Sequence, residues 1–139
     1  MAARNALLGN VAKADYRPLP LTVFTRPPLA SVGWTEGQAR THCPSVAVTR
    51  LPFSAVPRAV VDGETEGLLK VVTDGATGEI LGAHILGARA EEMIHQFAIA
   101  MKVRLTIQQL AEMIPVDPSF SEAVTEVALR ACRAAAAAA

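Results

Sequence analysis

The chain has only two cysteines, Cys43 and Cys132, among its 139 residues. This pair has neither the number nor the spacing of a disulfide framework, a zinc site or a Cys-x-x-Cys redox motif. We therefore expect two free thiols and no metal site built on sulfur.

The chain also lacks an excess of either charge, because Lys plus Arg and Asp plus Glu both number 13. A neutral chain without a basic patch does not match a nucleic-acid binder. The apolar runs are too short to span a bilayer, and residues 1–10 lack the hydrophobic core of a signal peptide. We expect a cytoplasmic protein with no nucleic-acid or membrane partner.

Several catalytic patterns are missing as well. Neither a G-x-G-x-x-G fingerprint nor a P-loop occurs, so no phosphate cradle is predicted. No serine, histidine and acid follow the order of a hydrolase elbow. Glu92 and His95 have the Glu-x-x-His spacing of di-iron bundles. Such sites need a second copy and two further carboxylates, so we expect no metal site.

The residues present predict strands first and helices later in the chain. The clearest pattern is a hairpin of two strands, 68–73 and 79–86, around a Gly-rich loop at 74–78. Other expected strands are 21–25 and 46–51. Expected helices are 35–40, 56–61, 90–101, 106–113 and 119–133, with capping boxes at Thr35, Thr106 and Ser119. This order indicates an α+β fold, an antiparallel β-sheet with helices packed on one face.

The most informative segment is Ile114-Pro-Val-Asp-Pro-Ser-Phe-Ser-Glu122. Pro118 disfavours helix at Asp117, and Ser119-x-x-Glu122 reads as a capping box before an apolar stripe. Asp117 is therefore expected on a rigid shoulder just outside a helix. By itself, this reading explains Glu122 as a structural residue.

The same segment resembles the His-Pro-Thr-x-x-Glu signature of the flavin-dependent pyridine nucleotide-disulfide oxidoreductases, which include dihydrolipoamide dehydrogenase, glutathione reductase and mercuric reductase. Residues 23–36 are similar to the beginning of that family's C-terminal domain. Residues 67–87 resemble its strand hairpin, and residues 90–94 its following helix. The resemblance runs in family order from about Arg4 to Arg130.

The resemblance implies three segments: a connector from an upstream flavin domain at 1–18, a dimerisation domain at 19–133 and a poly-alanine tail at 134–139. It implies a homodimer in which Asp117 and Glu122 complete the partner's active site and Pro118 lies near the partner's flavin. FAD and NAD(P) would bind upstream domains of a parent oxidoreductase. This chain alone is expected to hold no cofactor and to be inactive.

Asp117 departs from the family pattern because a histidine is expected at this position. In thiol-handling members that histidine moves protons to a dithiol, and the downstream glutamate orients it. An exposed aspartate is mostly ionised at neutral pH and donates protons poorly. The departure suggests a parent enzyme of an atypical kind, whose substrate needs no dithiol protonation.

Two alternatives stay open. A free-standing self-association module without redox activity would use its acids as helix caps alone. The gene sequence upstream of Met1 distinguishes the two hypotheses. The enzyme hypothesis requires an open reading frame that extends upstream through two glycine-rich fingerprints, and the module hypothesis requires one that starts at Met1. A monomeric carrier of a small ligand would instead require a dominant apolar cavity and no self-association.

Overall fold

The loop at 74–78 folds the chain into the predicted hairpin. The computed structural model describes residues 1–138, and in it β4 (Leu68–Asp74) pairs antiparallel with β5 (Ile80–Leu86). The Asp74 carboxylate accepts hydrogen bonds from the backbone N–H groups of Ala76 and Thr77, at 2.8 and 2.9 Å. Gly78, with φ of 76°, supplies the left-handed residue that closes the turn.

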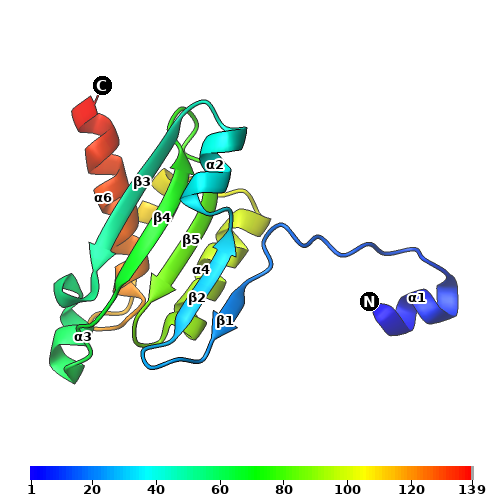
Figure 1. Cartoon of the computed structure of the whole chain (residues 1–139), viewed down its shortest axis with the longest axis horizontal. Helices are drawn as coiled ribbons and strands as arrows, with labels where there is room; N and C mark the ends of the chain where they lie inside the picture. Colours follow the sequence, from blue (N-terminus) through cyan, green and yellow to red (C-terminus); the bar gives the residue numbers. More distant parts are fainter. Residues whose placement is uncertain (139) are drawn as a thin grey trace.

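Three further strands extend the hairpin into one antiparallel sheet of order β1-β2-β5-β4-β3 (Figure 1). They are β1 (Leu21–Val23), β2 (Leu29–Gly33) and β3 (Val46–Pro52). The sequence did not indicate β2 as a strand. In the structure it pairs with β5 along its whole length, and its Ala30 and Val32 are buried in the core.

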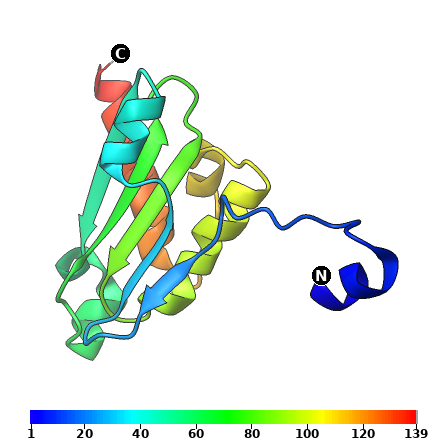
Figure 2. The same ribbon diagram turned by 45° about the vertical axis from the view of Figure 1, so that its right-hand side comes forward.

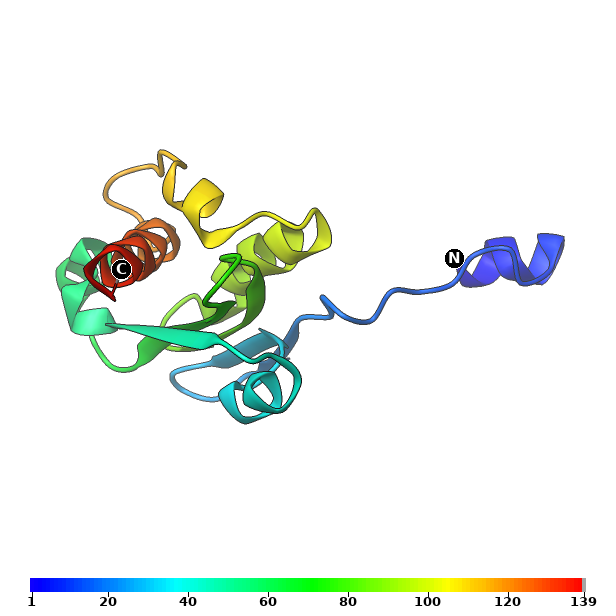
Figure 3. The same ribbon diagram turned by 90° about the horizontal axis from the view of Figure 1, so that it is seen from above.

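Two long helices cover one face of the sheet, α4 (Ala90–Lys102) and α6 (Glu122–Ala138), with α5 (Ile107–Ala111) beside α6 (Figure 2). Their apolar stripes meet alternate sheet residues in a single core. Its largest fully buried side chains include Phe53, Leu69, Ile85, Ile94 and Phe97. The predicted α+β fold is confirmed. The short α2 (Glu36–His42) lies on the opposite face (Figure 3).

Local capping explains where the short helices begin. Thr35 and Thr106 each form the predicted capping box, with Gln38 and Gln109 as partners. Phe53–Ala55 forms a 3-10 turn, and α3 (Pro57–Asp62) starts at a proline and ends at Gly63 with φ of 71°.

The last helix begins later than the sequence suggested. It starts at Glu122 rather than Ser119. Glu122 Oε2 accepts a hydrogen bond from the Ser119 N–H at 3.1 Å, but the Ser119 hydroxyl oxygen is buried without a hydrogen-bond partner among the described residues. Half of the predicted capping box is therefore formed, and Ser119 does not act as the side-chain cap.

The first residues also differ from the expectation of an irregular connector. Ala2–Leu8 forms a helix, α1, with no buried residue. Asn5 fastens it to the following segment by two hydrogen bonds to the backbone of Ala12, at 2.8 and 3.0 Å. The helix projects away from the sheet (Figure 1). Within residues 1–138, no helix has the length and apolar character needed to cross a bilayer.

Candidate functional site: an acid pair before the last helix

The loop between α5 and α6 is anchored at one end by Phe120. Its ring lies 6.4 Å from that of Phe53, centroid to centroid, and Phe53 is fully buried. Ala123 and Val124, in the first turn of α6, are also buried. The end of the loop is thus fixed by the core, while the residues before it extend into solvent.

The structure brings the two predicted acids, Asp117 and Glu122, together. The pKa of Glu122 is raised above its usual value, and the largest cause is hydrogen bonding with the Asp117 carboxyl. Loss of hydration through burial raises this pKa further. The bond from the Ser119 N–H opposes this rise, because it stabilises the carboxylate. Because its pKa is raised, Glu122 keeps its proton to a higher pH than an ordinary glutamate does.

Exposed apolar residues flank the acids. Ile114 is 93% exposed and Val116 is 79% exposed. Asp117 and Pro118 are exposed on the same loop. Beside the acids, Glu122, Ala123 and Glu126 line a shallow hollow together with the segment 55–57. The loop therefore offers an apolar contact surface next to an acidic group.

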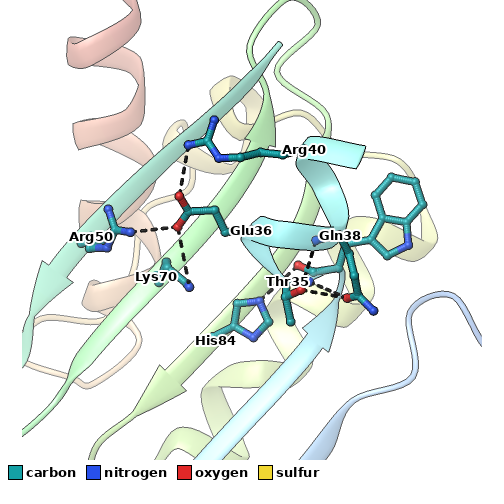
Figure 4. Close-up of polar contacts among 8 residues, drawn as sticks. Thr35, Glu36, Gln38, Arg40, Arg50, Lys70 and His84 are labelled. Atoms are coloured by element: carbon teal, nitrogen blue, oxygen red, sulfur yellow. Dashed lines mark hydrogen bonds and ion pairs between the residues drawn. The ribbon is translucent and has the colours of Figure 1, made fainter. Parts of the chain in front are cut away.

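A second polar cluster, which the sequence reasoning missed, lies on the opposite face of the sheet. Glu36 forms ion pairs with Arg40 at 3.1 Å, Arg50 at 2.9 Å and Lys70 at 4.0 Å (Figure 4). The hydrogen bond from Arg40 is the main cause that lowers the pKa of Glu36. The i,i+4 spacing of Glu36 and Arg40 was visible in the sequence. The other two pairs depend on strand register.

His84 belongs to the same face and has a structural contact. Its Nε2 lies 3.1 Å from the Trp34 carbonyl oxygen, so the ring N–H donates to that oxygen (Figure 4). Burial lowers the pKa of His84, and nearby Lys70 adds to the effect. The pKa shift favours the neutral ring, which ties β5 to the turn before α2.

The Glu-x-x-His pattern on α4 does not form a cluster. His95 Nδ1 contacts the Glu91 carbonyl oxygen at 2.9 Å, one turn back on the same helix. Within the part of the chain that the structure describes, no three His, Cys, Asp or Glu side chains gather as metal ligands would.

Comparison with known proteins identifies the domain. Residues 19–128 match the family described as "Pyridine nucleotide-disulphide oxidoreductase, dimerisation domain". The chain therefore belongs to the pyridine nucleotide-disulphide oxidoreductase family. Within that family, it corresponds to the dimerisation domain.

Individual relatives agree with this assignment. The chain is 40% identical over 116 residues to a dihydrolipoyl dehydrogenase of Corynebacterium glutamicum, covering 82% of the chain and 25% of the relative. It is 38% identical over 125 residues to a mercuric reductase of Lysinibacillus sphaericus, covering 90% and 23%. The chain spans about a quarter of the length of these relatives.

Solved structures show the same fold. The HOCl-induced flavoprotein disulfide reductase RclA from Escherichia coli superimposes with a TM-score of 0.84 at 36% identity, covering 91% of this chain and 30% of that one. LpdA from Mycobacterium tuberculosis gives a TM-score of 0.82 at 31% identity, covering 93% and 28%.

Proposed function

We propose that this chain is the homodimerisation domain of a flavin-dependent, NAD(P)H-linked oxidoreductase. The observation that carries the proposal is the match of residues 19–128 to the family's dimerisation domain. The relatives are about four times as long as the aligned region, which leaves room for nucleotide-binding domains. In this proposal the parent protein binds FAD and NAD(P) outside the present chain, and the isolated chain has no turnover.

The loop before α6 is the proposed contact with the second subunit. Ile114 and Val116 are the supporting observation, since two large apolar side chains stand exposed on one loop. Burying one such side chain contributes about 1.5–3 kcal/mol. A second copy that covers both would bury apolar surface and enclose the neighbouring acids in the same step.

The double substitution Ile114→Asp and Val116→Asp is expected to weaken self-association of the parent protein at least about tenfold. The reason is that burying one such side chain contributes about 1.5–3 kcal/mol, and 1.4 kcal/mol corresponds to a tenfold change in the association constant. The measurement is molar mass by light scattering across a dilution series. Phe24→Asp is the matched control, because Phe24 is 81% exposed on the loop that follows the edge strand β1, and α6 packs near β3 at the opposite edge of the sheet. An unchanged dimer in the Ile114 and Val116 variant would contradict the proposed contact.

Asp117 and Glu122 are the groups proposed to enter the partner's active site, with Pro118 beside the partner's flavin. The support is their position on the exposed loop and the raised pKa of Glu122. Covering the pair would remove water from around it, and desolvation raises carboxyl pKa values further. Glu122 would then hold its proton to a higher pH than it does on the exposed loop.

The aspartate at 117 leads us to propose an atypical parent enzyme. A carboxyl group does not reproduce the proton shuttle of an imidazole at neutral pH. A mercuric reductase-like enzyme, or another whose acceptor needs no dithiol protonation, fits this substitution. Mercuric reductases are among the relatives, together with dihydrolipoyl dehydrogenases.

Replacing Asp117 with histidine in the full-length parent is expected to give no gain in disulfide reduction. The physical reason is that the proposed enzyme does not use this position to protonate a dithiol. The measurement is NAD(P)H-dependent reduction of a disulfide substrate by the two proteins. Robust dihydrolipoamide turnover by the unmodified enzyme would contradict the proposal, whatever the variant does.

A further inference from the structure

Arg104 has a backbone conformation that suits glycine better than arginine. It follows the end of α4 with φ of 57°. The Arg104 N–H donates to the Met101 carbonyl at 3.2 Å, and the Leu105 N–H donates to the Ala100 carbonyl at 2.8 Å. This pair of bonds is the helix-ending motif in which a left-handed glycine is the usual residue. A side chain at this position strains the backbone.

The Arg104 side chain borders a hollow at the end of the sheet. Trp34 and Met101 supply an apolar wall, and Arg17, Lys102 and Glu79 supply charged side chains. Trp34 is 39% exposed, and its ring stacks on that of His42 with ring centroids 4.8 Å apart. The hollow therefore joins a fixed aromatic surface to a group of cations.

Arg104 is the cation of this group that has no acidic partner within the described residues and can therefore bind an anionic ligand. Asp15 pairs with Arg17 at 3.0 Å and with Lys102 at 3.2 Å, so one carboxylate occupies both. None of the salt bridges among residues 1–138 includes Arg104. Glu79 and the carbonyl groups at the C-terminal end of α4 disfavour the binding of an anion. The hollow nevertheless has more cations than acids: the cations are Arg17, Lys102 and Arg104, and the acids are Asp15 and Glu79.

We propose that this hollow binds a small anion carried on a planar apolar ring, an aryl phosphate or aryl carboxylate. The Arg104 guanidinium binds the anionic group through charge-assisted hydrogen bonds, and the ligand ring packs on Trp34. The lining of this hollow includes no residue of the loop proposed as the dimer contact, so the site does not depend on the proposed function of the acid pair.

The strain alone does not mark a site, because Arg89 shares it. Arg89 precedes α4 with φ of 61° but does not line the hollow. The two arginines therefore form a matched pair for an experiment. They have the same backbone conformation, and they differ in their access to the hollow.

The proposed test is an NMR titration of the 139-residue chain with phenyl phosphate, observed at the indole N–H. The chain has a single tryptophan, so this signal is unambiguous. We expect a saturable shift, and at least about tenfold weaker binding by Arg104→Gly, in line with the loss of a hydrogen bond to a charged group. Both Arg104→Gly and Arg89→Gly are expected to raise the melting temperature, while Arg89→Gly keeps the affinity unchanged.

Three outcomes would overturn the proposal. The first is an indole signal that does not move to saturation with phenyl phosphate. The second is binding by Arg104→Gly that equals that of the unmodified chain while its melting temperature shows an intact fold. The third is equal affinity for inorganic phosphate and phenyl phosphate, which would remove the role of Trp34.

Discussion

Replacing Phe53 with alanine is expected to lower the free energy of unfolding by about 3–5 kcal/mol. Phe53 is fully buried, and its ring contacts Phe120 and lies against Gly87. The substitution leaves a cavity in the core, and the surrounding structure relaxes only partly to fill it. Since small domains are stable by about 5–15 kcal/mol, this one change removes a large part of the total. Urea denaturation measures it.

The effect should extend to the acid pair, because Phe120 loses the ring against which it packs. We expect faster amide exchange around Glu122 than in the hairpin of β4 and β5. Phe24→Ala is the matched control, since the same atoms are removed from a side chain that is 81% exposed. A loss of stability in Phe24→Ala as large as that in Phe53→Ala would contradict the assignment of the core.

Replacing Gly82 with alanine is expected to cost about 3 kcal/mol, near the upper end of overpacking effects. A Cβ atom at this position would meet the backbone of Trp34, including its carbonyl oxygen. That oxygen accepts the hydrogen bond from His84, and the Trp34 N–H donates to the Leu81 carbonyl at 2.8 Å. Moving Trp34 therefore breaks the junction of β2, β5 and α2. Thermal unfolding is the measurement.

The control for Gly82 is Gly37, which lies within α2 at a place where an added methyl group has open space around it. Gly37→Ala is expected to stabilise the protein by about 0.5–1 kcal/mol, because alanine favours helix. The two variants make the same chemical change with opposite expected signs. Destabilisation by both would indicate that space at Gly82 is not the cause.

Local sequence signals predicted much of the fold. The loop at 74–78 specified the hairpin, and the spacing of Met93, Ile94 and Phe97 specified the buried face of α4. The capping boxes at Thr35 and Thr106 formed as expected. These features depend on residues close together in the chain, where propensity and periodicity act directly.

The errors arose where distant neighbours decide the structure. β2 consists of Leu29-Ala-Ser-Val-Gly33, whose small residues give a weak strand pattern. It becomes a strand because β1 and β5 pair with both of its edges. Ser119 was predicted to cap α6, but Phe120 packs into the core and the helix starts three residues later.

The candidate site was predicted in part. The position of Asp117 and Glu122 at a helix start followed from Pro118 and the capping pattern, and the structure brings the two acids together. The hollow beside Arg104 had no sequence signal, because its walls come from four separate segments of the chain. The Glu36 cluster likewise depends on the register that sets Arg50 opposite Lys70.

The strand order has a consequence for synthesis on the ribosome. Of the five strands of the sheet, β1 and β2 are made first, and they can form only a two-stranded ribbon, which is marginally stable by itself. The neighbour that completes β2 is β5, and the Trp34 to His84 contact across them joins residues 50 positions apart. Until β5 is made, the nascent ribbon has an unpaired edge open to aggregation. Chaperone protection of the growing chain is therefore most valuable between the translation of Gly33 and that of Leu86.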